Sequence, residues 1–182
     1  HHRQTRRVGP GAMEQLELPQ GAVIRPLCRE DRLPLKTLLE ATRVFTVDEI
    51  GIALELIDSV LDTPGQHDYV IAVYDHHGPA GYYCIGPTPG TDGTFDLYWI
   101  AVDPLRHGQG IGSALDRHAA AYIRSHNGRL VIAETSSTSR YDLTRRFYQT
   151  RKYAELARIR DYYRPGDDLV VYGKILVPHQ GG

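Results

Sequence analysis

Three glycines alternate at the start of a predicted helix, and this segment restricts the possible folds more than any other part of the chain. The apolar run Phe95–Val102 precedes the glycines and has the β-branched and aromatic residues of a strand. The predicted helix Gly110–His126 repeats its apolar side chains on one face and ends at Asn127-Gly128, and a buried strand, Leu130–Ala133, follows it. A strand, a crossover helix and a strand are therefore expected in the middle of a mixed sheet.

The rest of the chain predicts further strands and helices around this unit. A first strand, two amphipathic helices and two short strands precede it, and a short helix and a closing hairpin follow it. The expected order β-α-α-β-β-β-α-β-α-β-β describes an α/β fold with a mixed (α+β) sheet of seven strands. The outer elements are expected at Ala22–Leu27, Glu30–Thr42, Val47–Leu61 with Thr46 as its N-cap, Tyr69–Tyr74, Gly81–Ile85, Leu143–Gln149, Tyr153–Ile159 and Leu169–Lys174, the last two joined by a turn at Pro165–Asp167.

The composition is that of one ordinary folded domain. The 182 residues are 41% hydrophobic and 24% charged, which supplies enough apolar side chains for a sizeable core. A formal net charge of −1 gives no basic field for nucleic acid, and no polybasic stretch points to a membrane surface. No apolar run approaches the roughly 20 residues of a membrane helix, and no secretory signal is evident. Two isolated cysteines, Cys28 and Cys84, are expected to be buried thiols in a reducing, cytoplasmic compartment.

The first twelve residues have the composition of an expression-tag remnant with a linker. Met13 is the expected native start, and a single domain is expected over residues 13–182. The nine histidines show no metal-ligand spacing, so no metal site is expected.

The glycine-rich turn His107–Gly112 is suited to bind a phosphate group. Without Cβ atoms the backbone can approach a ligand closely, and the free N–H groups at the start of a helix favour an anion. A Walker P-loop is excluded because no Gly-Lys-Ser/Thr follows. A dinucleotide site fits less well, because Ser113 stands at the third glycine position, a loop separates the turn from its strand, and only about fifty residues follow Glu134.

A third type of phosphate binder fits these residues best. The segment resembles the acetyl-CoA-binding motif Arg/Gln-x-x-Gly-x-Gly/Ala of the GNAT superfamily of N-acetyltransferases, and the preceding Ile-Ala-Val-Asp-Pro is also typical of that family. His107 replaces the Arg or Gln of the motif, with Arg106 one residue earlier, so the backbone part of the phosphate site is expected to be kept while the side-chain contact is open. The resemblance covers roughly residues 22–177 and implies a cofactor site formed by Ile100, Ala101, Val102, His107, Gly108, Gln109, Gly110, Ile111, Gly112, Ser113 and Tyr148.

The segment Phe147-Tyr148-Gln149-Thr150-Arg151-Lys152-Tyr153 resembles the Phe-Tyr-x-x-x-Gly-Phe signature of the same family. The resemblance implies that Tyr148 is the general acid, because a phenol with a pKa near 10 can protonate a departing thiolate whose conjugate acid has a pKa near 8.5. Lys152 stands where glycine usually ends the helix. Since lysine is strained in a left-handed cap, the helix is expected to end differently, with Tyr148 slightly displaced.

The resemblance also implies where the acceptor amine binds. Asp96 and Glu134 are the candidates for the base that removes the proton of the amine. Main-chain groups of the strand ending at Val102 are expected to pair with the acetyl-pantetheine arm of the cofactor and to stabilise the oxyanion. The substrate pocket is expected to draw on Glu30–Leu61 and the final hairpin. Possible substrate contacts are Tyr141, Tyr162, Tyr163 and Asp167, with Ser136–Ser139 near the cofactor end of the cleft.

Two functions of different classes follow from the resemblance. The first is an enzyme that moves an acetyl group from acetyl-CoA to a primary amine of a small molecule, an amino acid or a peptide N-terminus, directly in a ternary complex, since no cysteine occupies a nucleophile position. The second is a non-catalytic acyl-CoA-binding sensor or scaffold, and an intact Tyr148 favours the enzyme. The resemblance is compatible with a homodimer but does not establish one.

Overall fold

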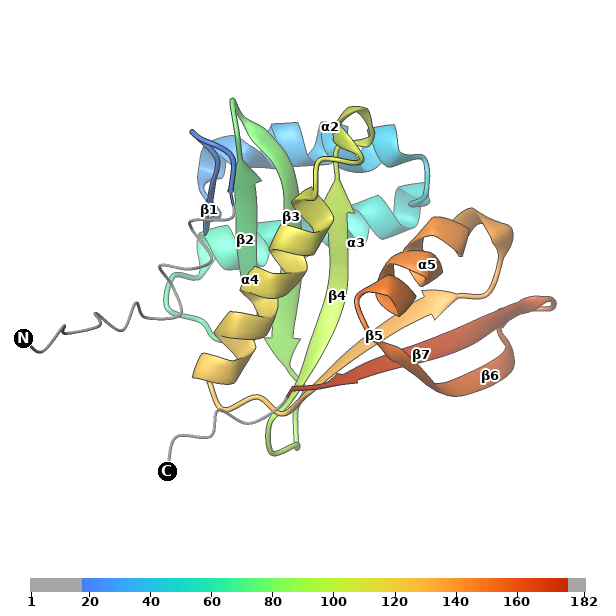
Figure 1. Ribbon diagram of the computed structural model, residues 1–182. Coiled ribbons are helices and arrows are strands. Elements are labelled where there is room, and N and C mark those ends of the chain that lie inside the picture. The colour runs from blue at the N-terminus through green and yellow to red at the C-terminus, as the bar shows by residue number, and fades with distance from the viewer. Residues whose placement is uncertain (1–17, 177–182) are drawn as a thin grey trace, which may run out of the picture.

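The computed structural model describes residues 18–176 and contains a seven-stranded mixed sheet (Figure 1). The strand order is β1-β2-β3-β4-β5-β7-β6, and all neighbouring strands are antiparallel except β4 and β5. The predicted element order and fold class are confirmed. The predicted tag segment, residues 1–12, lies outside the described residues.

The observed elements differ from the predicted ones mainly at their ends. The start of the predicted first helix is a short 3-10 turn, η1 (Arg29–Asp31), and the two hairpin strands at the end of the chain are longer than predicted. Thr46 caps the second helix as predicted, because its hydroxyl accepts the N–H of Glu49 at 3.1 Å. The elements are β1 (Val23–Pro26), α2 (Arg32–Thr42), α3 (Val47–Asp62), β2 (Val70–Asp75), β3 (Pro79–Pro87), β4 (Thr94–Val102), η2 (Pro104–Arg106), α4 (Ile111–Ser125), β5 (Leu130–Ser136), η3 (Ser139–Tyr141), α5 (Asp142–Thr150), β6 (Ala154–Arg164) and β7 (Asp167–Ile175).

Helices cover both faces of the sheet (Figure 1). Helix α4 packs on one face through Leu115 and Ile123, which join a core cluster with Tyr83 of β3. Helices α2 and α3 pack on the opposite face, where Leu35 and Ile57 are fully buried. Within the described residues, no helix is long and apolar enough to cross a lipid bilayer. Cys84 is buried as predicted, whereas Cys28 is only partly buried, and neither forms a disulfide.

The parallel pairing of β4 with β5 stops early. Only three residues of β4, Thr94 to Asp96, pair with β5, although β4 continues to Val102 and β5 to Ser136. Beyond this point the two strands diverge, and β5, β7 and β6 form an arm that turns away from the rest of the sheet with α5 on it (Figure 1). The far half of β4 therefore has no strand neighbour on the β5 side within residues 18–176.

The expectation that Lys152 changes the end of α5 is wrong. Lys152 adopts the left-handed conformation itself, with φ 68°, and its N–H donates to the Gln149 carbonyl at 3.1 Å. The Tyr153 N–H donates to the Tyr148 carbonyl at 2.9 Å, which completes the hydrogen-bond pattern of a glycine-type cap. The rings of Tyr153 and Tyr148 are in contact, with centroids 5.2 Å apart. This apolar contact and the two hydrogen bonds offset the strain at the exposed lysine.

We expect substitutions of Lys152 to affect stability according to their tolerance of positive φ. Lys152→Gly should be at least as stable as the parent protein, and Lys152→Val should be less stable than Lys152→Gly by about 1–2 kcal/mol, because a branched side chain is strained in this conformation. Urea unfolding of the three proteins measures the difference. Equal stability of the valine and glycine variants would contradict the left-handed cap.

Candidate active site

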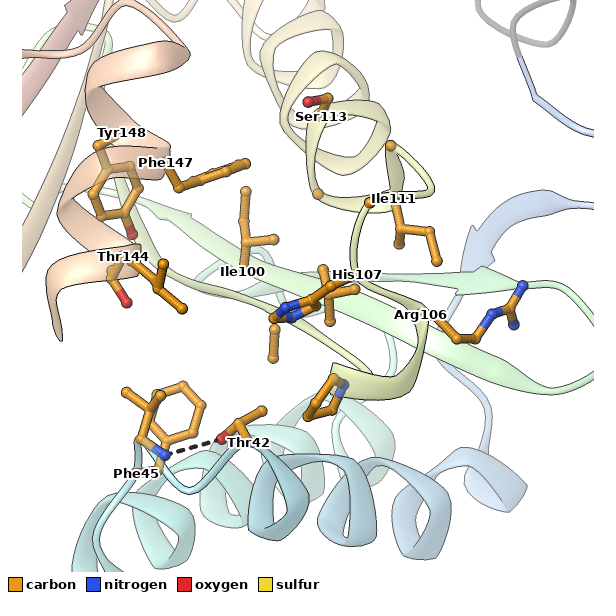
Figure 2. Close-up of a pocket in the computed structure, with 18 residues that line it drawn as sticks. Thr42, Phe45, Ile100, Arg106, His107, Ile111, Ser113, Thr144, Phe147 and Tyr148 are labelled. Carbon is orange, nitrogen blue, oxygen red and sulfur yellow. Dashed lines mark hydrogen bonds between the residues drawn. The ribbon is translucent and has the colours of Figure 1, made fainter. Parts of the chain in front are cut away.

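A cavity of about 510 Å³ lies where β4 and β5 diverge (Figure 2). Its walls come from the end of β4, the glycine turn, the first residues of α4, one face of α5 and the loop between α2 and α3. The residues that line it are Thr42, Val44, Phe45, Ile100, Ala101, Val102, Pro104, Arg106, His107, Gly108, Gly110, Ile111, Gly112, Ser113, Leu143, Thr144, Phe147 and Tyr148.

The glycine turn presents free backbone N–H groups at one end of this cavity. Gly108 and Gly110 have φ values of 82° and 75°, which side chains rarely tolerate, and no atom lies within 4 Å of an ideal Cβ at either position. The first intrahelical bond of α4 runs from the Ala114 N–H to the Gly110 carbonyl at 3.0 Å. The three N–H groups before Ala114 thus point out of the helix start, where the helix dipole favours a phosphate.

Gly112 has a different role from the other two glycines. A Cβ on Gly112 would lie 3.1 Å from Cε2 of Phe147 and 3.7 Å from Cγ2 of Val102. Its missing side chain therefore lets α4 approach α5 and the end of β4 closely. This contact brings the phosphate site and Tyr148, the neighbour of Phe147, to the same cavity.

His107 and Arg106 point in different directions. Arg106 donates through Nη1 to the His76 carbonyl at 2.8 Å and contacts His76 Nδ1 through Nη2 at 2.9 Å. Its guanidinium is therefore held against the turn between β2 and β3. The imidazole of His107 faces the middle of the cavity (Figure 2). Of these two residues, His107 is the one that can contact a ligand with its polar atoms.

Tyr148 lies at the other end of the cavity, opposite the glycine turn. The residue is only 4% exposed, and its hydroxyl points into the cavity near Thr144 (Figure 2). Burial raises the pKa of Tyr148 well above its usual value, and the negative charge of Asp116 raises this pKa further. The phenol is accordingly a neutral hydrogen donor at physiological pH.

The predicted bases, Asp96 and Glu134, do not line the cavity. Asp96 is paired with Gly86 and Ile132, in the part of the sheet where β4 and β5 are still joined. The neighbours of Asp96 in sequence belong to the core cluster on the α4 side, so Asp96 faces the α2 and α3 side. Glu134 is exposed near the point where β4 and β5 diverge. It lies close to Tyr163, whose pKa is raised mainly by burial and further by the negative charge of Glu134.

The predicted substrate residues lie outside this cavity, around the β6–β7 hairpin and η3. Tyr141 donates its hydroxyl to both carboxylate oxygens of Glu49, at 3.1 and 3.0 Å, and so links η3 to the start of α3. Tyr162 and Tyr163 are exposed, with their rings edge to face at 5.0 Å. The pKa of Tyr163 is raised by burial as the largest cause, and the negative charges of Glu134, Asp167 and Glu49 raise it further.

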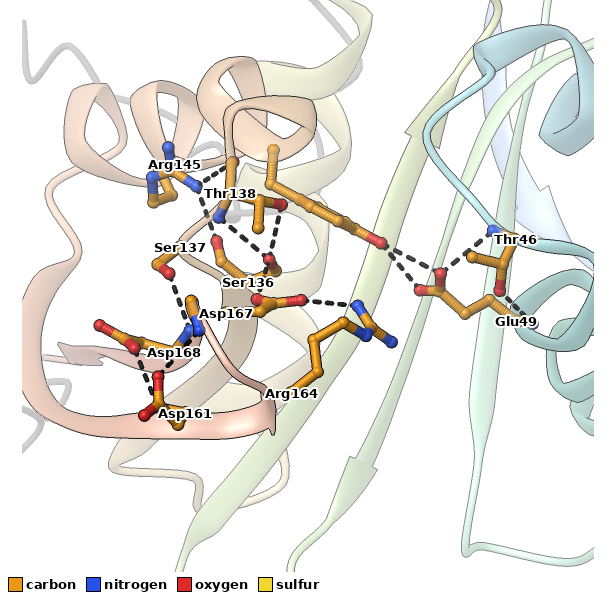
Figure 3. A network of polar contacts seen from close by, with 12 residues as sticks. Thr46, Glu49, Ser136, Ser137, Thr138, Arg145, Asp161, Arg164, Asp167 and Asp168 are labelled. Atoms are coloured by element: carbon orange, nitrogen blue, oxygen red, sulfur yellow. Dashed lines mark hydrogen bonds and ion pairs between the residues drawn. The ribbon is translucent and has the colours of Figure 1, made fainter.

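Asp167 is held inside the hairpin. It is 4% exposed, its Oδ1 accepts the Ser136 hydroxyl at 2.5 Å, and its Oδ2 accepts Arg164 Nη1 at 2.8 Å (Figure 3). Ser137 accepts the Asp168 N–H at 2.8 Å. These residues therefore fix the hairpin against the end of β5, and both oxygens of Asp167 already have partners.

The residues of the predicted cofactor site all line the cavity except Gln109. Val44 and Phe45, in the loop between α2 and α3, close one side of the cavity. The sequence indicated this part of the site only as the range Glu30–Leu61. Leu143 and Thr144 of α5 were also missed. The helical period places them on the same face as Phe147 and could have indicated them.

Comparison with known proteins identifies the family. The family model described as an acetyltransferase (GNAT) domain matches residues 66–155. A crystal structure from Desulfovibrio desulfuricans, assigned to the GNAT acetyltransferases, is 37% identical and covers 86% of this chain and 99% of its own, with a TM-score of 0.82. The chain belongs to the GNAT acetyltransferase family. Membership makes acetyl-CoA the cofactor of the protein.

More distant structures share the fold. The ribosomal-protein-S18-alanine N-acetyltransferase from Escherichia coli is 16% identical over 88% of this chain and 98% of its own, with a TM-score of 0.68. An aminoglycoside 6′-N-acetyltransferase crystallised with coenzyme A is 16% identical over 86% of this chain and 98% of its own, with a TM-score of 0.67. No curated protein sequence matches the chain.

The glycine turn can be tested with a matched pair of glycines. Gly110 and Gly90 both have φ 75° and no atom within 4 Å of an ideal Cβ, but Gly90 lies in the β3–β4 turn, outside the cavity lining. Gly110→Ala and Gly90→Ala should lose similar stability, about 1 kcal/mol. Only Gly110→Ala should weaken acetyl-CoA binding, because only Gly110 lines the cavity. The expected loss of affinity is about tenfold or more, which corresponds to one lost charge-assisted hydrogen bond.

Isothermal titration with acetyl-CoA measures both affinities, and urea unfolding measures both stabilities. Equal affinity of the two variants would contradict the assignment of the turn as the phosphate site.

Proposed function

We propose that this protein is an N-acetyltransferase that moves an acetyl group from acetyl-CoA directly to a primary amine in a ternary complex. The observation that carries the proposal is the position of the Tyr148 hydroxyl, which faces the same cavity as the glycine turn. The glycine turn would bind phosphate at one end of the cavity, and Tyr148 is a neutral acid at the other end. This arrangement suits a long cofactor that carries phosphate at one end and a thioester at the other. The acceptor is a small molecule, an amino acid or a peptide N-terminus.

The residues of the cavity fit this cofactor. The N–H groups of Ile111, Gly112 and Ser113 would hold the pyrophosphate, and His107 would add a side-chain contact. The unpaired edge of β4 from Ile100 to Val102 offers backbone groups to the pantetheine arm. When bound, acetyl-CoA supplies an activated acetyl group and a thiolate leaving group.

The protein's own residues would then stabilise the negative charge that develops and supply a proton to the leaving group. A backbone N–H of β4 would stabilise the oxyanion that forms when the amine attacks the thioester carbonyl. Tyr148 would donate its proton to the departing sulfur. This step requires a neutral phenol, and Tyr148 is neutral at physiological pH.

The acceptor amine would approach from the acidic side of the divergence. Glu49 and Glu134 act there on Tyr163, and negative charge attracts the ammonium form of the acceptor. Of the two candidate bases, Glu134 has the better position, because it is exposed near the point where β4 and β5 diverge, whereas Asp96 lies in the paired part of the sheet. Glu134 would accept the proton of the ammonium group, directly or through water.

Tyr148→Phe tests the acid. The variant keeps the ring and its contacts but removes the hydroxyl, so kcat should fall by about 10²-fold or more while the KM for acetyl-CoA stays the same. Thiol release measured with an accepted amine gives both parameters. An unchanged kcat would contradict the role of Tyr148. Acetyl-CoA binding without turnover of any amine in a broad panel would instead favour a non-catalytic acyl-CoA-binding module.

Glu134→Gln tests the base. The substitution removes the charge with little change of shape, so kcat/KM for the amine should fall at least about tenfold while the KM for acetyl-CoA is unaffected. Asp96→Asn is the matched control on the neighbouring strand and should change kcat/KM much less. The reverse order of the two effects would assign the base to Asp96.

A further inference from the structure

Asp116 is an almost completely buried carboxylate outside the cavity lining. It lies on α4 and is 1% exposed. Its Oδ2 accepts Arg151 Nε at 3.0 Å and Lys174 Nζ at 3.3 Å, and its Oδ1 accepts the Tyr153 hydroxyl at 2.9 Å. One buried carboxylate thus joins α4 to the segment that ends α5 and to β7.

Burying such a group is costly and needs an explanation. A buried ion pair contributes little net stability compared with apolar side chains of the same volume. Here two cations and a phenol are arranged around a single carboxylate, and the ammonium group of Lys174 also lies 5.3 Å from the centre of the Tyr153 ring. What the cluster does provide is a fixed geometry, because each partner comes from a different part of the fold.

The cluster holds both ends of the glycine-type cap that follows Tyr148. Arg151 and Tyr153 flank Lys152, the residue with positive φ. The Tyr153 N–H donates to the Tyr148 carbonyl at 2.9 Å, and the two rings are in contact. A shift of Tyr153 would therefore move Tyr148 directly.

The other end of the cluster is tied to the phosphate site. Asp116 lies about one helical turn after Gly112 on α4, the helix whose first N–H groups form that site. The ring of Phe147 in turn contacts the position of Gly112. The Asp116 cluster and the contact of Phe147 with Gly112 are therefore two links between α4 and α5. Together they set the position of α5 relative to the start of α4.

We propose that Asp116 is a positioning residue for the reaction: through Tyr153 and Arg151 it fixes the hydroxyl of Tyr148 at a set place relative to the glycine turn. This inference rests on the proposed function, in which Tyr148 is the acid. Burial raises the pKa of Tyr148, and the charge of Asp116 raises it further, which shows that the two residues lie close together.

Tyr153→Phe is the mildest test, because it keeps the ring and the cap but removes the hydroxyl that binds Asp116. Asp116→Asn is the stronger variant, but it leaves two cations without a counter-charge and can impair folding. Tyr172→Phe is the matched control. Tyr172 is also buried, and its ring is 5.6 Å from that of Tyr148, but its hydroxyl has only a 3.4 Å contact with Gln149 and none with Asp116.

Each variant is measured by thiol release, in the parent protein and in the Tyr148→Phe background. Tyr153→Phe should lower kcat by about tenfold and leave the KM for acetyl-CoA within about twofold, because a misplaced acid slows the chemical step without affecting cofactor binding. In the Tyr148→Phe background the same substitution should have little further effect, since the residue that it positions is gone. Tyr172→Phe should leave kcat close to that of the parent protein.

Three results would overturn this inference but not the proposed function. They are an unchanged kcat in Tyr153→Phe, an equal loss of kcat on this substitution in both backgrounds, or an equal loss of kcat in Tyr172→Phe. In each of these cases Tyr148→Phe by itself still lowers kcat, so the proposed function stands. An unchanged kcat in Tyr148→Phe would instead remove the acid and the inference with it.

Discussion

The early end of the pairing between β4 and β5 is the constraint on which the rest of the structure depends. Three paired residues join the two halves of the sheet, and the far half of β4 then has no strand on that side in the part of the chain that is described. Unpaired backbone groups inside a protein require other partners. The cavity at the divergence places such groups beside the glycine turn, and in the proposed function this gap in the sheet holds the cofactor.

The two sides of this gap are built differently. On the cofactor side, α4 and α5 form one unit, joined by the close approach at Gly112 and by the buried carboxylate of Asp116. On the acceptor side, side chains from separate segments meet around exposed tyrosines, as in the contact of Tyr141 with Glu49. In the proposed function, the joined α4 and α5 would hold the constant acyl donor, and the side of the hairpin would contact the acceptor that determines specificity.

The sequence predicted the features that depend on local patterns. The glycine turn, the helical period of α4 and the N-cap at Thr46 all follow from residues that are close together in the chain. Lys152 was interpreted wrongly, because the sequence shows the strain of a left-handed lysine but not the ring contact of Tyr153 with Tyr148 that helps to offset it. Tyr153 is itself held by Asp116, which is 37 positions away. The contacts of Glu49 with Tyr141 and of Asp116 with Lys174 gave no signal, since these partners lie 92 and 58 positions apart. Asp167 has the residue type of a substrate contact, but its oxygens bind Ser136 and Arg164.

The central claim is direct acetyl transfer from acetyl-CoA to an amine. Mass spectrometry of a reaction of the parent protein with acetyl-CoA and a panel of amines, including peptides with free N-termini, tests it most directly. The account predicts one acetylated amine for each thiol released, and a protein whose intact mass does not change. Thiol release without an acetylated amine, or an acetylated protein that forms before the amine is added and then transfers its acetyl group, would contradict it.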